Sequence, residues 1–408
     1  MKCILHIGTA KTGTTLIQQW LYSNREALSA RGVYLSDMLE KPNNRLLPAF
    51  FMARLESWAK ARRITTPEQK AAHFKGFPDR FRAEIAEASR THSHFVITSE
   101  YMHARMDDPD EIRALRAFLV EVFDNVTVVC YFRNQFDLIV SRYSTALKKN
   151  ARSDLQSFLN AASPEDGFYN YLAVADLWAA AFGRENCDFR IYDRAEFPGG
   201  DIRLDFLNRI DPALDAGALD FSVESANESL YALQVSAFRA LNARIPYWKG
   251  ESGGQNLLNR RIKAALSKVE TLKVGRVQSD ARAEIEQRFD ASNRAFFQKY
   301  FGCGNRFHAG GPQADPGPDL SMGQVQQIVG DVVSALLPFA EQGLEAEDAR
   351  ALTGMADKIE SGGTLSTQEA QILRALARKA KPGGPAADRK RPKAPRTRRE
   401  ARQGKVES

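Results

Sequence analysis

The sequence predicts an α/β fold in which a parallel β-sheet is flanked by helices. Short apolar runs alternate along the chain with segments of helical spacing, and the first run leads into a glycine-rich loop. Strands that alternate with helices usually form a parallel sheet covered on both faces. The chain has 408 residues, of which 43% are hydrophobic, so it can bury a sizeable core.

The N-terminal elements are expected in the order strand, helix and a group of short helices. Residues 2–7 form a short apolar run that ends at a glycine, as buried parallel strands do. Helical spacing then extends from residue 14 to about residue 30. Residues 40–92 predict two or three helices, with breaks at Pro67 and Pro78.

The centre of the chain continues the alternation. Further strands are expected at residues 94–98, 126–132 and 187–192, and helices at 113–123, at 169–182 and from residue 133 to about 149. The run at 126–132 is the strongest strand signal in the sequence.

Four regions are expected from N- to C-terminus. They are a P-loop-like domain at 1–308, a Pro/Gly-rich linker at 309–319, a helical extension at 320–378 and a basic disordered tail at 379–408. Within the extension, an apolar stripe at 325–337 predicts one helix, and the capping box Ser366-x-x-Glu369 predicts the start of another.

The net charge of +7 is concentrated in the tail. Residues 379–408 contain 11 basic and 3 acidic residues, which leaves the rest of the chain with a net charge of −1. A nucleic-acid-binding body would carry its own basic face, so we expect no specific nucleic-acid partner. The tail is expected to contact membranes or acidic surfaces only weakly.

Cysteine usage and hydropathy predict a cytoplasmic protein, with the membrane surface as a peripheral alternative. The four cysteines are far apart and form no C-x-x-C pair, which argues against a disulfide framework or a zinc site. No apolar run approaches the roughly 18 residues that span a bilayer. The N-terminal run lacks the features of a signal peptide.

The segment GTAKTGTT between the first expected strand and helix predicts a phosphate site. Glycines allow a tight turn, after which backbone N–H groups and a helix N-terminus point toward an anion. The segment matches the P-loop pattern G-x-x-x-x-G-K-[ST] at Gly8, Gly13 and Thr15. Thr14 occupies the lysine position, and the lysine stands mid-loop as Lys11. A purely structural turn is the alternative.

Two motifs resemble those of PAPS-dependent sulfotransferases, which use 3′-phosphoadenosine 5′-phosphosulfate. The family motif K-x-G-T-T-x-L is matched, with its leucine one place early, by Lys11-Thr12-Gly13-Thr14-Thr15-Leu16. The family also has an arginine at a strand end and a serine eight residues later, here Arg133 and Ser141. The stretches at 143–148, 227–230 and 292–302 resemble bacterial sulfotransferases of carbohydrates and capsules. The resemblance covers roughly residues 1–308.

The resemblance implies transfer of a sulfuryl group from PAPS to a hydroxyl of a carbohydrate or glycoconjugate. The 5′-phosphosulfate would be held by Lys11, Thr12, Gly13, Thr14 and Thr15. Lys11 would also neutralise charge on the leaving group. Arg133 and Ser141 would bind the 3′-phosphate, the arginine through charge-assisted hydrogen bonds. No metal is required for this reaction.

Glu100 is the expected catalytic base, because it follows a predicted strand where related carbohydrate sulfotransferases carry a catalytic glutamate. The alternative is that Glu100 caps the next turn or pairs with Arg105. His103 is the competing base, and His103 and Lys148 are also candidates for substrate binding. His6 is expected to pack beneath the loop.

Two other functions stay open at this point. One is an ATP-dependent P-loop phosphotransferase that needs magnesium, and the other is a nucleotide-binding scaffold without turnover. Lys11 together with Arg133 and Ser141 favours a 3′-phosphorylated nucleotide over ATP. The presence of both Lys11 and Glu100 disfavours the inactive scaffold.

Overall fold

A computed structural model describes residues 1–223, 230–245, 248–249, 254–275, 281–307 and 320–341. The chain divides into two compact units, Met1–Leu320 and Ser321–Ser408, and each is described by itself. The expected linker at 309–319, the helix expected from Ser366 and the basic tail lie outside the described residues.

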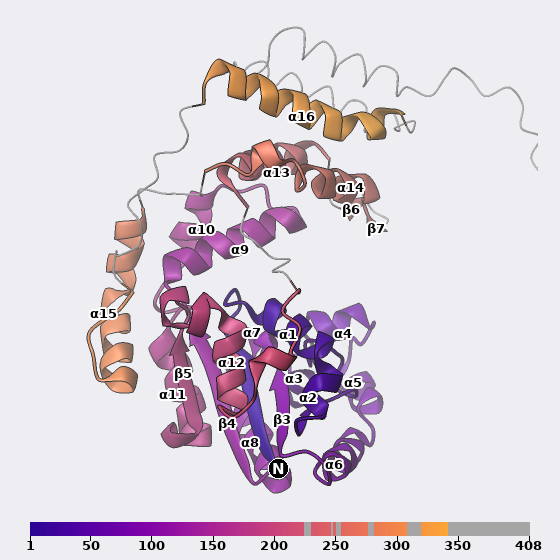
Figure 1. The fold of residues 1–408 in the computed structure, drawn as a ribbon, viewed down its shortest axis with the longest axis vertical. Helices are drawn as coiled ribbons and strands as arrows, with labels where there is room; N and C mark the ends of the chain where they lie inside the picture. Colours follow the sequence, from indigo (N-terminus) through magenta and orange to yellow (C-terminus); the bar gives the residue numbers. More distant parts are fainter. Residues whose placement is uncertain (224–229, 246–247, 250–253, 276–280, 308–319, 342–408) are drawn as a thin grey trace, which may run out of the picture. The chain divides into compact units, whose positions relative to one another are not determined.

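The first unit contains a five-stranded parallel sheet, which confirms the predicted fold class (Figure 1). Its strands are β1 (Lys2–Gly8), β2 (Val33–Leu35), β3 (His94–Thr98), β4 (Asn125–Phe132) and β5 (Cys187–Ile191), in the order β2-β3-β1-β4-β5. In the paired register, His6 of β1 lies beside Thr98 of β3 and Val129 of β4. The carboxyl ends of these three strands therefore meet at one edge of the sheet.

Helices bury both faces of the sheet because successive side chains of a strand point to opposite faces. Along β1, Ile4 packs in one core with Trp20 of α1 (Thr14–Ser23) and Phe206 of α12 (Ile202–Ile210). Its neighbours Cys3 and Leu5 belong to the second core, which also contains side chains of α8 (Pro109–Val122) and α11 (Tyr171–Phe182).

The remaining helices of the first unit lie between and after the strands. They are α2 (Arg25–Ser29), α3 (Leu46–Phe51), α4 (Ser57–Ala61), α5 (Pro67–His73), α6 (Phe77–Ala88), α7 (Glu100–Arg105), α9 (Gln135–Lys149), α10 (Leu155–Ala161), α13 (Ala232–Arg244), α14 (Leu257–Leu266) and α15 (Arg282–Phe301). A short antiparallel pair is formed by β6 (Trp248–Lys249) and β7 (Gly254–Gln255). The second unit contains α16 (Met322–Glu341).

The structure differs from the sequence-based expectation in three places near the N-terminus. Residues 40–92 form four helices, α3 to α6, rather than two or three, and Pro67 and Pro78 stand in the first turns of α5 and α6, where proline is tolerated. The helix expected from residue 14 to about 30 is divided into α1 and α2 at Asn24. The Asn24 side chain donates to the carbonyl of Asp220 at 2.8 Å and accepts from its N–H at 2.6 Å. The strand β2 was not expected, because three residues are too few to give a clear alternation pattern.

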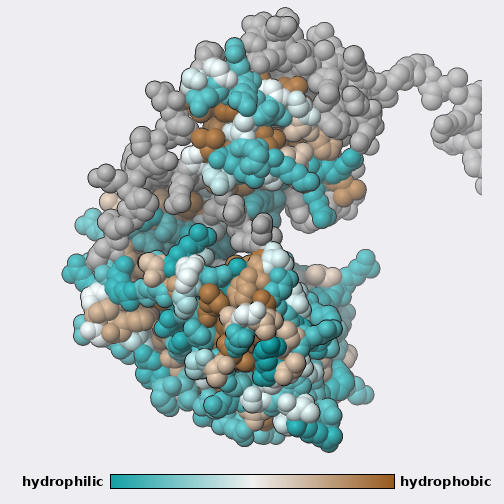
Figure 2. All heavy atoms as spheres, viewed as in Figure 1, coloured by the Kyte–Doolittle hydropathy of each residue, from teal (hydrophilic) through white to brown (hydrophobic). Residues whose placement is uncertain are grey.

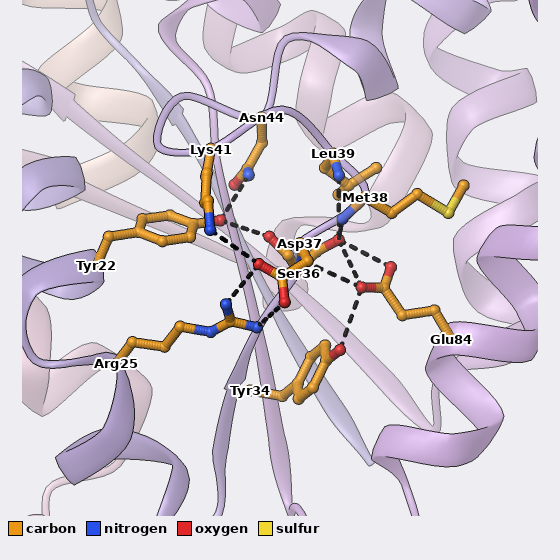
Figure 3. Close-up of polar contacts among 10 residues, drawn as sticks. All are labelled: Tyr22, Arg25, Tyr34, Ser36, Asp37, Met38, Leu39, Lys41, Asn44 and Glu84. Carbon is orange, nitrogen blue, oxygen red and sulfur yellow. Dashed lines mark hydrogen bonds and ion pairs between the residues drawn. The ribbon is translucent and has the colours of Figure 1, made fainter.

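Several hydrogen bonds hold the loop after β2, residues 36–45, in place (Figure 3). Glu84 of α6 accepts hydrogen bonds from the Ser36 hydroxyl at 2.8 Å and from the Asp37 N–H at 3.2 Å. At the other end of the loop, Asn44 accepts from the N–H of Thr98 and donates to the Tyr22 hydroxyl. These bonds fix the loop against the end of β3.

In Figure 2, hydrophilic residues surround an area of hydrophobic residues in the middle of the lower body. Among the described residues, no helix is long and apolar enough to cross a membrane.

Candidate functional site

The loop that joins β1 to α1 lies at the carboxyl edge of the sheet. Two of its glycines, Gly8 with φ of 121° and Gly13 with φ of 75°, adopt the positive φ values that favour glycine. A Cβ atom on Gly8 would lie 3.4 Å from the Glu100 Cα and 3.4 Å from the His103 Cβ. The glycine thus permits a close approach between the start of the loop and α7.

The backbone of this loop can accommodate an anion. The N–H of Thr9 donates to the carbonyl of Tyr131, and the N–H of Ile17 donates to that of Gly13. Between them, the N–H groups of residues 10–16 have no hydrogen-bond acceptor within the described part of the chain. The ten-residue helix α1 also begins without a side-chain cap. Free N–H groups at a helix N-terminus are a suitable environment for a phosphate.

The threonines of the loop have different roles. The Thr12 hydroxyl is buried and donates to the carbonyl of Thr9 at 2.7 Å, so it braces the loop internally. Thr14 is also buried, at the first position of α1, and Thr15 is half-buried beside it. Thr12 therefore contributes a backbone N–H rather than a hydroxyl to the site.

Arg133 connects the end of β4 to this loop. Its Nη1 donates to the carbonyl oxygen of Lys11 at 3.1 Å. Its guanidinium carbon also lies 5.4 Å from the ring centroid of Tyr192. The hydrogen bond uses one of five guanidinium donors, which leaves others for a ligand.

Lys11 is a half-buried amine in a cationic environment. Burial lowers the pKa of Lys11 to about 8, and the nearby Lys148, Lys149 and Arg133 contribute in the same direction, while Glu100 opposes them. A charged ammonium in such surroundings is destabilised until an anion neutralises it. The electrostatics of the site therefore favour an anionic ligand next to Lys11.

Glu100 is the first residue of α7, directly after β3 and Ser99. Its Oε2 accepts a hydrogen bond from Gln18 Nε2 of α1 at 2.8 Å, and its Oε1 lies 3.6 Å from Arg45 Nη2. The alternative pairing with Arg105 is wrong, since the Arg105 Nε lies 3.7 Å from Glu56. Glu100 thus presents a partly exposed carboxylate beside the loop.

His103 lies on the same helix but is buried, and its ring centroid is 4.9 Å from that of Phe168. Neither ring nitrogen has a hydrogen-bond partner among the described residues. Burial, and to a lesser degree Arg142, lowers the pKa of His103 to about 3, so the ring is neutral at physiological pH. Of the two residues, Glu100 is thus the more exposed side chain and His103 the buried one.

His6 lies under the loop, as expected. It is fully buried and its Nδ1 lies 2.8 Å from the Thr98 hydroxyl. Burial lowers the pKa of His6 to about 3. Its ring packs against Phe206 and Tyr131, with centroid distances of 5.1 Å and 5.8 Å. His6 is therefore a neutral packing residue.

Ser141 and Lys148 lie on α9, the helix that follows Arg133. They are seven residues apart and therefore share one side of the helix. Ser141 is buried, and no hydrogen bond joins it to Arg133. Lys148 lies in the last turn, where its carbonyl accepts from Lys263 Nζ at 3.2 Å. Its charge acts on Lys11, as described above.

Three charged or polar residues of the site were not among the sequence-based candidates: Gln18, Arg45 and Lys149. Gln18 follows Thr14 by four residues, so it lies on the same side of α1, and helical spacing could have indicated it. Arg45 is distant in sequence from the motifs and reaches Glu100 only through the fold of the loop at 36–45.

No protein-family model matches the sequence. A protein from Archaeoglobus fulgidus, described as an uncharacterized protein, is 29% identical over 206 residues, which are 48% of this chain and 52% of the relative. The chain thus spans about half the length of this relative. Within the described residues, no group of three or more His, Cys, Asp or Glu side chains is arranged to hold a metal ion.

Replacement of Lys11 by methionine should stabilise the ligand-free protein at pH 7. The native pKa of Lys11, about 8, lies below the ordinary value of 10.5, so the charged amine has a free-energy penalty that destabilises the folded state. The penalty is complete below pH 8 and disappears as the pH rises toward 10.5. We expect a gain on the order of 1–3 kcal/mol in the free energy of unfolding at pH 7.

Chemical denaturation of Lys11→Met between pH 7 and 10 measures this effect, with the exposed Lys60→Met as the control for removal of a positive charge. A gain that declines with rising pH is expected for Lys11→Met only. A loss of stability at pH 7 would contradict the electrostatic description of the site.

Proposed function

We propose that this chain is a PAPS-dependent sulfotransferase that transfers a sulfuryl group to a hydroxyl of a carbohydrate or glycoconjugate. The observation that supports it most is the meeting of three features at one edge of the sheet. They are the loop around Lys11 with its free N–H groups, Arg133 from the end of β4, and Glu100 after β3.

The donor half of the site matches a nucleotide with two separate anionic groups. The free N–H groups of residues 10–16 and the Lys11 ammonium are suited to a 5′-phosphosulfate. Arg133 donates to the Lys11 carbonyl of the loop and has further donors for a 3′-phosphate. Ser141, buried on the helix that follows, is the second proposed ligand of this phosphate.

The acceptor half depends on Glu100. In the proposed reaction, the acceptor oxygen forms a bond to sulfur while the bond from sulfur to the bridging oxygen of the 5′-phosphate breaks. Glu100 takes the proton of the acceptor hydroxyl, and Lys11 neutralises the charge that develops on the leaving phosphate. Gln18 fixes the direction of the Glu100 carboxylate through its hydrogen bond to Oε2. The chemistry assigned to these residues requires no metal ion.

We further propose that the reaction takes place in the cytoplasm, where the basic tail could bring the protein to an acidic surface. All four cysteines are free, and Cys3, Cys130 and Cys187 are buried. Unpaired cysteines are typical of reducing compartments.

Adenosine 3′,5′-bisphosphate should stabilise the protein without any metal. At 100 times its dissociation constant, the ligand should add about 2.7 kcal/mol to the free energy of unfolding.

Arg133→Ala should weaken binding of the bisphosphate far more than binding of adenosine 5′-phosphate, because Arg133 is assigned to the 3′-phosphate. Thermal unfolding with each nucleotide, in EDTA and with magnesium, measures both effects.

Two outcomes would argue against this assignment. If only ATP with magnesium raised the melting temperature, a phosphotransferase would be the better description. If Arg133→Ala weakened both adenosine nucleotides equally, the arginine would act through its bond to the Lys11 carbonyl rather than on the 3′-phosphate.

Glu100→Gln should reduce turnover by about 10²–10⁴-fold, the usual range for loss of a general base. Its affinity for the bisphosphate should stay nearly unchanged, since the substitution is isosteric and Glu100 faces the acceptor. Transfer of labelled sulfate from PAPS, with bisphosphate binding measured in parallel, separates the two effects. Near-normal turnover would show that Glu100 is a structural partner of Gln18 and Arg45, and His103 would be tested next.

A further inference from the structure

An open groove of about 510 Å³ lies next to the candidate base. Its lining residues are Asp37, Glu40, Lys41, Asn43, Arg45, Ser57, Trp58, Ala61 and Arg62. Two of them contact the start of α7: Arg45 lies 3.6 Å from Glu100, and the Ser57 hydroxyl lies 2.8 Å from that of Tyr101. Arg45 thus both lines the groove and pairs with the carboxylate that is proposed to receive the acceptor proton.

Both acidic residues of the groove are already paired. Asp37 accepts from Lys41 Nζ at 3.2 Å and forms a two-pronged ion pair with Arg25. Glu40 accepts from Trp58 Nε1 at 2.8 Å and forms an ion pair with Arg62. These contacts also engage the cationic groups of Lys41 and Arg62.

Arg45 is held more loosely than the other charged groups of the groove, by an ion pair with Glu100 and by the Tyr101 ring, whose centroid lies 5.6 Å from its guanidinium carbon. Its guanidinium forms no hydrogen bond with any described residue, its Nε is buried without a partner, and its nearest ion-pair distance is the 3.6 Å to Glu100. The side chain is 42% exposed, so the outer edge of the guanidinium is accessible from the groove. A guanidinium offers five N–H donors in a fixed plane, and a carboxylate fits two of them at once.

Arg45 has a fixed position because hydrogen bonds hold the loop that carries it. Asn44, directly before it, is fully buried and accepts from the Thr98 N–H at 2.9 Å. It also donates to the Tyr22 hydroxyl at 3.0 Å (Figure 3). The Tyr22 hydroxyl in turn donates to the Ser36 carbonyl at 2.8 Å. A guanidinium held by such a support is suited to recognise a ligand group at a fixed place.

We propose that this groove binds the acceptor and that Arg45 selects a sugar chain that carries a carboxylate. This inference rests on the proposed sulfotransferase function and adds the chemical class of the acceptor to it. The sugar carboxylate pairs with the outer edge of Arg45, while a hydroxyl of the same chain lies at Glu100. Asn43, a further polar residue of the groove, is available to sugar hydroxyls.

Isothermal titration calorimetry of the full chain tests the proposal with oligosaccharides of galacturonate, mannuronate or glucuronate. The methyl ester of each oligosaccharide is the uncharged control. At least one acid should bind, and about tenfold or more tightly than its ester, as loss of a charge-assisted hydrogen bond implies. Arg45→Gln should remove this difference, Arg45→Lys should restore part of it, and Lys60→Gln, an exposed charge outside the groove, should retain it.

Asn43→Asp provides a second test that leaves Arg45 intact. It places a negative charge in the groove with almost no change in shape, so it should weaken the acid and not its ester. The inference is wrong if no acid binds, if acid and ester bind equally, or if Arg45→Gln and Asn43→Asp leave the preference unchanged. Binding of adenosine 3′,5′-bisphosphate to the same variants tests the donor site separately, so that failure of the groove and failure of the proposed function are distinguishable.

Discussion

The site depends on the alignment of three adjacent parallel strands, β3, β1 and β4, whose carboxyl ends meet at one edge of the sheet. Ligands of open α/β sheets commonly bind at this edge, where strand order reverses. Here β1 ends in the Lys11 loop, β3 in Glu100 and β4 in Arg133. The backbone bonds from Ser99 to His6 and from Thr9 to Tyr131 extend the pairing past the sheet itself.

The close packing of charged side chains around Lys11, at this edge of the sheet, has an electrostatic cost. The Lys11 amine lies near the cations Lys148 and Lys149 of α9 and Arg133 after β4, and Glu100 of α7 offsets them only in part. Positive backbone φ at Lys11 adds strain of the kind often found in ligand-binding loops. An anionic ligand at this loop would offset the charge repulsion.

The sequence was sufficient to predict the parallel sheet, the loop and the positions of Lys11, Glu100 and Arg133 at strand ends. Buried apolar strands and a glycine-rich turn are local patterns, which can be recognised from a single sequence. The partners of Glu100 were not predictable in this way. Arg45 reaches it because Asn44, 54 residues before Thr98, bonds to the end of β3. Such long-range hydrogen bonds leave no periodic signal.

A crystal structure of the protein with adenosine 3′,5′-bisphosphate tests the central claim most directly. We expect the 5′-phosphate at the N–H groups of residues 10–16 and next to Lys11, with the 3′-phosphate at Arg133 and Ser141. Glu100 should lie on the side of the 5′-phosphate that faces away from the ribose, where PAPS carries its sulfuryl group. A nucleotide bound away from the β1–α1 loop, or with its 5′-phosphate at Arg133, would contradict the account.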